Sequence, residues 1–192
     1  MRKLIVFNLV SVDGYFAGED GDINWHQVDD EFNKFAVEQT KTFGAIIFGR
    51  TTYELFESYW PGAVADPATA PDDLEIAKTI DEVEKIVFSK TLKEVAWKNS
   101  KLLHEVDPEE IKKLKEQEGK DMVIFGSGTI VQALTNLGLV DEYRLMINPI
   151  ILGKGKPMFK DVKEMHKLKL LNTRTFGNGN VLLYYEPIKS SE

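Results

Sequence analysis

Residues 124–134 read IFGSGTIVQAL: the end of an apolar strand, three residues with almost no side chain, and the start of a helix. A strand that runs directly into a helix is typical of α/β proteins. In open α/β sheets, ligands bind beyond the carboxyl ends of the strands, where a helix N-terminus offers free N–H groups to an anion. Gly126, Ser127 and Gly128 therefore fit either a plain turn or a backbone that lies close to a ligand's phosphates.

A second junction of this kind lies in residues 46–56, IIFGRTTYELF. Arg50, at the mouth of the turn, would form charge-assisted hydrogen bonds to a phosphate. Two helix N-termini at one sheet edge would hold the two halves of a pyrophosphate. Alternatively, Gly49 is a turn glycine and Thr51 a helix cap. Neither junction has the GxxxxGK[ST] or GxGxxG spacing, so ATP hydrolysis and an ordinary Rossmann site are not indicated.

A third strand end carries VFSKTL, residues 87–92. Ser89 and Lys90 would face the same ligand edge as Arg50. A 2′-phosphate beside these three residues would select NADPH over NADH, because only the phosphorylated coenzyme offers the extra charge. The alternative is that Lys90 is a solvated loop cation.

Residues 11–32, SVDGYFAGEDGDINWHQVDDEF, contain three glycines that predict a mobile loop. The loop ends at Trp25 and the acidic run Asp29, Asp30 and Glu31. Acidic residues favour helix N-termini whether or not they catalyse, so capping accounts for the run. The alternative is that one carboxylate faces a pocket and transfers a proton.

The alternation of apolar runs and helical periodicity predicts the order of elements. Strands are expected at Lys3–Val10, Ala45–Phe48, Lys85–Phe88, Met122–Phe125, Glu142–Ile151, Lys167–Phe176 and Val181–Glu186. Helices are expected at Asp29–Thr42, Thr51–Tyr59, Asp72–Thr79, Asp107–Glu118, which Asp107-Pro108 starts, and Thr129–Leu137, which Gly138 ends. The loop Pro61–Asp73 should lie at the surface near the site mouth, and the tail KSSE should fray.

This order predicts an α/β protein with a central sheet flanked by helices and an antiparallel extension at its C-terminal end. The length of 192 residues suits a single domain over 1–192. The net charge of -7 argues against a nucleic-acid partner. No apolar run is long enough for a membrane span, and polar residues break the N-terminal run, so we expect a cytoplasmic protein and no membrane partner. The absence of cysteine and the wide separation of the three histidines indicate no metal site.

Four motifs in combination resemble the dihydrofolate reductase-like superfamily: GRTTYE after a strand, VFSKT, IFGSGTIVQAL and LVDEYRLMINPIILGKGKPMF. The opening SVDGYFAGEDG and the LVDEYRL segment make the closer match to the reductase half of the bifunctional riboflavin-biosynthesis deaminase–reductase and its stand-alone relatives. The similarity covers residues 2–186, nearly the whole chain.

The resemblance implies a mixed, mostly parallel sheet, a homodimer, and NADPH-dependent hydride transfer to a small heterocyclic substrate, such as a pyrimidine ribosylamine. By position, the cofactor phosphates would be held by Gly49, Arg50, Thr51 and Thr52, and the adenosine end by Ser89 and Lys90. The pyrophosphate and nicotinamide side would be lined by Gly126, Ser127, Gly128, Thr129 and Ile130. The loop Val12–Asn24 would cover the nicotinamide, and Asp30 would be the proton donor.

The sequence also departs from its relatives. Folate reductases pair an arginine with the glutamate tail of folate, whereas the stretch YWPGAVADPATAPDDLE has none, so folate is not favoured. The zinc deaminase half is absent. Gly126-Ser127 replaces a Gly-Gly that often has a cis peptide, which leaves that geometry open. A second hypothesis is an NADP(H)-binding protein or sensor without turnover, and a third is an interaction domain that uses its acidic surface.

Overall fold

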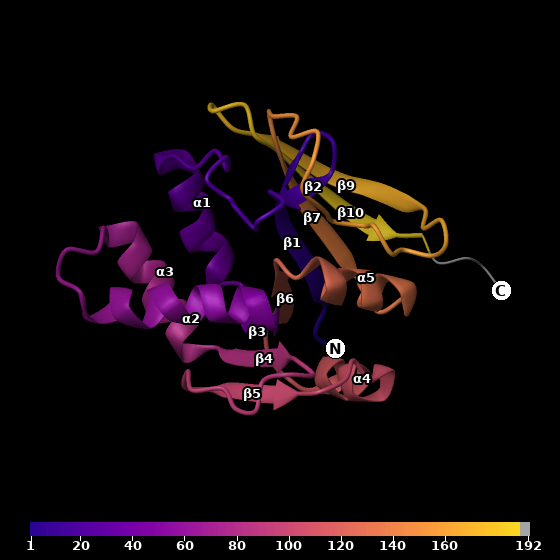
Figure 1. The fold of residues 1–192 in the computed structure, drawn as a ribbon, viewed down its shortest axis with the longest axis horizontal. Helices are drawn as coiled ribbons and strands as arrows, with labels where there is room; N and C mark the ends of the chain where they lie inside the picture. The colour runs from indigo at the N-terminus through magenta and orange to yellow at the C-terminus, as the bar shows by residue number, and fades with distance from the viewer. Residues whose placement is uncertain (189–192) are drawn as a thin grey trace.

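The computed structural model describes residues 1–188, so the tail KSSE lies outside the described residues. Within this range the chain forms an eight-stranded sheet in the order β5-β4-β3-β6-β1-β7-β10-β9 (Figure 1). The strands are β1 Leu4–Ser11, β3 Phe43–Gly49, β4 Glu84–Phe88, β5 Ser100–Leu103, β6 Asp121–Phe125, β7 Glu142–Asn148, β9 Leu168–Thr175 and β10 Val181–Pro187. The strands β5, β4, β3, β6, β1 and β7 are parallel, and β10 is antiparallel to both β7 and β9. The predicted mixed, mostly parallel sheet with a C-terminal antiparallel extension is confirmed.

Helices cover both faces of the sheet (Figure 1). They are α1 Asp30–Thr40, α2 Arg50–Ala65, α3 Pro71–Glu82, α4 Pro108–Glu116 and α5 Gly128–Asn136. Side chains alternate along β1, so Leu4 and Val6 pack in the core under α4 and α5, whereas Ile5 and Phe7 pack in the core under α1, α2 and α3. A strand that is buried on both faces reads as a continuous apolar run, which is why the central strands were recognisable in the sequence.

Two helix boundaries were predicted from their capping residues. The Asp107 carboxylate accepts a hydrogen bond from the Glu109 N–H at 3.0 Å, with Pro108 as the first residue of α4. Gly138 has a φ of 65° directly after the end of α5, and its N–H donates to the Thr135 carbonyl at 2.9 Å. Both predictions are confirmed, because local side-chain chemistry fixes these ends.

Other boundaries were wrong. The predicted loop Pro61–Asp73 is shorter, because α2 continues through Pro61 to Ala65 and α3 begins at Pro71. The proline removes only one N–H donor, and the aromatic rings of Phe56 and Trp60 before it pack together at 6.2 Å. Strand β7 ends at Asn148, before Pro149, rather than at Ile151.

Three short strands were missed. They are β5, β2 Tyr15–Ala17 and β8 Lys156–Pro157, and the last two pair with each other in a small separate sheet. Strands of two to four residues are too short to show a period of two in sequence. The tertiary contacts that create them are visible only in the structure.

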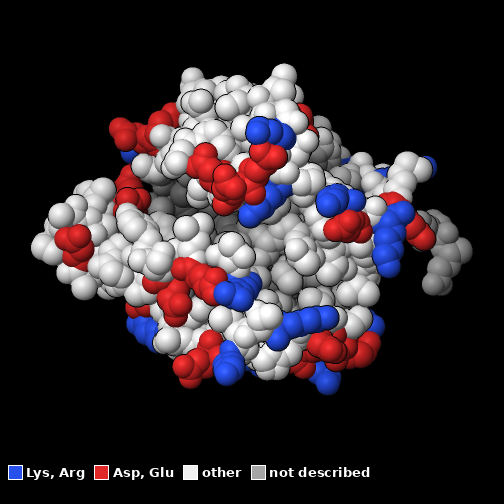
Figure 2. Space-filling view, viewed as in Figure 1, with Lys and Arg blue, Asp and Glu red and all other residues white. Residues whose placement is uncertain are grey.

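The sheet order determines which turns meet. Strands β3, β6 and β1 are adjacent and parallel, so the turns at their carboxyl ends lie along one edge of the sheet (Figure 1). On the face shown in Figure 2, charged side chains of both signs surround a largely uncharged central area. Among the described residues, no helix has the length and apolar character that crossing a membrane requires.

Candidate functional site

The two turns of small residues touch each other. The Gly49 N–H donates to the Ser127 hydroxyl at 2.6 Å, and the Ser127 N–H donates to the Thr52 hydroxyl at 3.1 Å. Residues far apart in sequence therefore join the turn after β3 to the turn after β6. The starts of α2 and α5 are held side by side at the carboxyl edge of the sheet.

The glycines at this junction are required by packing. A Cβ at Gly126 would lie 2.6 Å from the Thr52 hydroxyl oxygen, and a Cβ at Gly49 would overlap the Ser127 hydroxyl. A Cβ at Gly128 would lie 2.7 Å from a ring carbon of Phe16. Gly126 also has a φ of 62°, which disfavours any side chain. The plain-turn interpretation therefore accounts for the glycines, and evidence for a ligand has to come from the helix ends.

The starts of α2 and α5 differ from the other described helix starts. Helices α1 and α4 are capped by the carboxylates of Asp29 and Asp107, and α1, α3 and α4 each carry acidic residues in the first turn. Neither α2 nor α5 has a side-chain cap or an acidic residue there. The two positive helix ends that meet at this edge are therefore left without a compensating carboxylate, which suits an anion.

The individual amides at α5 can be assigned further. The N–H groups of Ile130 and Val131 donate to the Ser127 carbonyl at 2.8 and 3.0 Å, so they are already engaged. The side chain of Ile130 is buried in the core. Thr129, the second residue of the helix, is exposed, whereas Gly128 before it is buried and the Phe16 ring packs against it. The predicted contacts from Ile130 and Gly128 are therefore not supported by their positions, whereas Thr129 is well placed.

The predicted adenosine end also comes together. The Arg50 Nε donates to a Glu54 carboxylate oxygen at 2.8 Å, and Arg50 Nη1 donates to the Thr91 hydroxyl at 3.0 Å. The Ser89 hydroxyl accepts the N–H groups of Thr91 and Leu92, so it shapes the turn rather than facing solvent. Lys90 is exposed in this turn. Thr91 was missed in the sequence, where it appears only as an ordinary loop threonine.

The three candidate acids have different surroundings. Asp29 caps α1 by accepting the Phe32 N–H at 2.9 Å. Glu31 accepts the Gly177 N–H at 2.9 Å and lies 3.5 Å from Arg174. Asp30 is exposed at the first position of α1 and, within residues 1–188, forms no hydrogen bond or ion pair through its side chain. Of the three, Asp30 is the carboxylate that is available for another task.

A pair of asparagines fixes the segment that leads to Asp30. The Gln27 N–H donates to the Asn148 side chain at 2.7 Å, and the Gln27 carbonyl accepts from the Asn180 amide at 2.8 Å. Both asparagines are fully buried. The neighbouring His26 is partly buried, and burial lowers the pKa of its imidazole. This asparagine clamp, formed by Asn148 and Asn180, was not predicted from the sequence, because an asparagine beside proline or glycine looks like an ordinary turn residue.

The loop Val12–Asn24 is anchored at its start. The Asp13 carboxylate accepts hydrogen bonds from the Ser11 hydroxyl at 2.7 Å and from the N–H groups of Leu152 and Gly153. The Ser11 bond is the largest cause that lowers the pKa of Asp13, and the two backbone bonds add to it. Further along, the Phe16 ring packs against the start of α5. The loop therefore lies beside the junction of the two turns.

The comparisons with known proteins agree with this arrangement. A model of the RibD C-terminal domain matches residues 2–182. The chain belongs to this family. Uncharacterized protein YyaP of Bacillus subtilis is 37% identical over 190 residues, which cover 96% of this chain and 94% of that protein.

Solved structures establish the fold of this RibD C-terminal domain. A putative riboflavin biosynthesis protein from Shewanella sp. PV-4 has a TM-score of 0.73 at 21% identity, covering 97% of this chain and 99% of that chain. Dihydrofolate reductase from Enterococcus faecalis, complexed with NADP(H) and a second ligand, has a TM-score of 0.62 at 16% identity, covering 97% of both chains. The predicted match to the riboflavin-biosynthesis reductase domain is confirmed by the family model, and the predicted dihydrofolate reductase-like fold by these structures.

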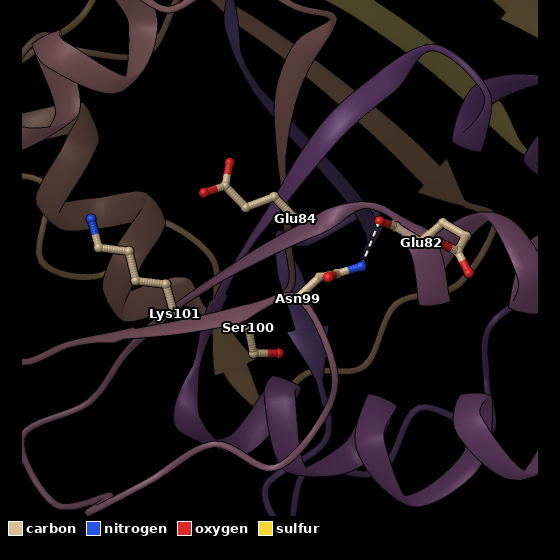
Figure 3. Close-up of a pocket in the computed structure, with 5 residues that line it drawn as sticks. All are labelled: Glu82, Glu84, Asn99, Ser100 and Lys101. Atoms are coloured by element: carbon tan, nitrogen blue, oxygen red, sulfur yellow. Dashed lines mark hydrogen bonds between the residues drawn. The ribbon is translucent and has the colours of Figure 1, made fainter.

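Two surface cavities of this RibD C-terminal domain lie away from the paired turns. One, of about 440 Å³, is lined by Glu82, Glu84, Asn99, Ser100 and Lys101 at the amino ends of β4 and β5 (Figure 3). There the Asn99 amide donates to the Glu82 carbonyl at 2.9 Å. The other, of about 390 Å³, lies between α2 and α3. The first is at the end of the parallel strands opposite to the candidate site, so it is not part of that site.

The close approach of the two turns predicts the effect of enlarging Gly126. Gly126→Ala should lower the free energy of unfolding by about 2–4 kcal/mol, because strain at positive φ adds to a clash with Thr52. Gly138→Ala is the matched control, since Gly138 has a φ of 65° but nothing within 4 Å of its Cβ position. The control should cost about 1–2 kcal/mol, the strain of positive φ alone. Urea unfolding curves measure both, and equal losses would show that the clash does not exist.

Proposed function

We propose that the protein is an NADPH-dependent reductase that transfers a hydride to a small heterocyclic substrate. The observation that carries the proposal is the pair of adjacent helix starts, α2 and α5, which lack both side-chain caps and first-turn acids. In a protein of net charge -7, such ends favour an anion through backbone dipoles rather than through an excess of cations. The complex of Enterococcus faecalis dihydrofolate reductase with NADP(H) supports the choice of a dinucleotide on this fold.

The order of the strands suggests how the coenzyme lies. Arg50, Thr91 and exposed Lys90 stand at the ends of β3 and β4, on one side of the paired turns. Strand β1 is the neighbour of β6 on the other side. The pyrophosphate would rest on the amides of the exposed residues Thr51 and Thr129, with the 2′-phosphate end of the coenzyme over β4. The nicotinamide would then lie over the carboxyl end of β1, beside the anchored loop.

In this arrangement the residues have separate tasks. Thr52 and Ser127 hold the turns together through their hydroxyl groups, and Gly49 and Gly126 allow them to approach. Arg50 and Lys90 supply positive charge for the 2′-phosphate, while Ser89 shapes their turn. The coenzyme supplies the hydride, and the protein orients the reactants and excludes water.

Asp30 is the proposed proton donor, directly or through a water molecule. Asp29 caps α1 and Glu31 accepts from Gly177, so Asp30 is the carboxylate of the acidic run that is left available. The hydrogen bonds from Asn148 and Asn180 to Gln27 fix the segment before it. Folate is not the favoured substrate, because the stretch 59–75 contains no arginine for a glutamate tail.

Coenzyme binding tests the first part of the proposal. Titration calorimetry should show binding of NADPH to the wild type. Arg50→Ala should weaken the binding of NADPH by about 1.5 kcal/mol, roughly tenfold, because a charge-assisted contact to the 2′-phosphate is lost. It should weaken the binding of NADH much less. Equal weakening of both coenzymes would show that Arg50 does not contact this phosphate. No heat with any phosphorylated nicotinamide coenzyme at millimolar concentration would refute the proposed function.

Turnover tests the second part. Oxidation of NADPH, followed at 340 nm with a panel of pterins, pyrimidine ribosylamines and quinones, should identify a substrate. On that substrate Asp30→Asn should lower kcat by about 10²-fold or more and leave NADPH binding unchanged, since general acid catalysis contributes on this scale. Full turnover by the variant would remove Asp30 as the donor. Tight NADPH binding without oxidation across the panel would favour a sensor instead.

We also propose that a second copy of the chain covers β9. All eight residues of this edge strand are exposed, among them Leu168, Leu170 and Leu171. An apolar edge strand favours association, and symmetric dimers are the commonest oligomers.

The dimer predicts a selective effect of charge on this strand. In sedimentation experiments the wild type should be a dimer, and Leu170→Asp combined with Leu171→Asp should be a monomer, because burying two carboxylates is unfavourable. Lys113→Asp on α4, away from β9, makes the same change of two units in net charge and should stay dimeric. A wild type that is still monomeric at a protein concentration of about 100 micromolar would contradict the proposal.

A further inference from the structure

We propose that Glu54 limits the preference of the site for NADPH over NADH by competing with the 2′-phosphate for Arg50. The inference rests on the proposed function and assigns a residue that sets coenzyme specificity. It follows from the partners of the Arg50 guanidinium, which is the main cation at the predicted 2′-phosphate end.

The guanidinium is already engaged on two sides. Its Nε donates to Glu54 at 2.8 Å, one helical turn along α2, and its Nη1 donates to the Thr91 hydroxyl at 3.0 Å. Bidentate recognition of a phosphate uses two N–H groups that point in the same direction. A phosphate that binds Arg50 must therefore displace the Glu54 carboxylate or share the guanidinium with it.

The cost of this competition follows from the exposure of the pair. The side chains of Arg50 and Glu54 are 52% and 44% exposed, so the ion pair itself contributes little to stability. A carboxylate that stays beside the guanidinium repels the doubly charged phosphate. For two phosphate charges at a separation of about 6 Å and an effective dielectric constant of 40–80, with the repulsion roughly halved by salt screening, this corresponds to about a three- to tenfold loss of affinity. NADH lacks the phosphate and avoids this loss.

A different role for Glu54 would also favour NADH over NADPH. A carboxylate near the adenosine ribose can accept hydrogen bonds from the 2′-hydroxyl of NADH, and removing it would weaken NADH. The Glu54 carboxylate oxygen already faces the Arg50 guanidinium, which favours competition for the arginine over direct contact with the ribose. The two roles predict different results for a variant without the carboxylate: tighter NADPH binding if Glu54 competes for Arg50, and weaker NADH binding if Glu54 contacts the ribose.

The experiment is a titration of NADPH and NADH against wild type, Glu54→Gln, Arg50→Ala and the double variant, at low and physiological salt. Glu54→Gln should bind NADPH about three- to tenfold more tightly and NADH within twofold of wild type, with a smaller gain at higher salt. In the Arg50→Ala background the same substitution should change NADPH affinity by less than twofold, because the half-exposed Glu54 side chain is then no longer held beside the phosphate. Glu118→Gln, which removes one exposed acid after α4, should leave both affinities unchanged.

Three results would overturn the inference. Unchanged NADPH affinity in Glu54→Gln would show that no competition occurs. Weaker NADH binding in this variant would assign Glu54 to the ribose. An equal gain with and without Arg50 would show a general charge effect. In each case NADPH still binds, so the proposed function stands, whereas a wild type that binds neither coenzyme would refute both.

Discussion

The hydrogen bonds between the two turns hold the candidate site together. Ser127 accepts from Gly49 and donates to Thr52, so one residue fixes the distance between the starts of α2 and α5. The glycines allow the two backbones to approach, and the Ser127 hydroxyl accepts from Gly49 and does not cap α5. The same contact that joins the turns therefore leaves a helix end free for a ligand.

This arrangement reconciles an acidic protein with an anionic ligand. Acidic residues occupy the first turns of α1, α3 and α4, but not those of the two helices that begin at the paired turns. Backbone N–H groups carry no net charge, so they attract a phosphate locally without changing the overall charge of -7. Selectivity for the ligand then depends on the few charged side chains around the turns.

Much of the fold was predictable because local chemistry and tertiary structure agree. The apolar runs of the central strands, the Asp107 cap and Gly138 each act within a few residues. Strands β2 and β8 were not predictable, since each exists only through its pairing with the other. Pro61 indicated a helix end that the structure does not have, because a single missing N–H did not outweigh the packing of α2.

The candidate site divides in a similar way. Sequence motifs placed Arg50 and the two glycine turns correctly at one sheet edge, because strand order is the only additional information needed. The hydrogen-bond partners of the side chains could not be predicted from the sequence. Nothing in the sequence shows that Ser89 is occupied by its own turn or that Arg50 contacts Glu54 and Thr91.

The asparagine clamp has a consequence for how the chain can vary. Asn148 and Asn180 form hydrogen bonds to the backbone N–H and carbonyl of Gln27, not to its side chain. Any amino acid except proline offers the same peptide group, so position 27 tolerates substitution while the two asparagines do not. In related chains the positions that control the approach to α1 would therefore be those of Asn148, at the end of β7, and Asn180, in the turn before β10, whereas the residue at position 27 would be free to vary.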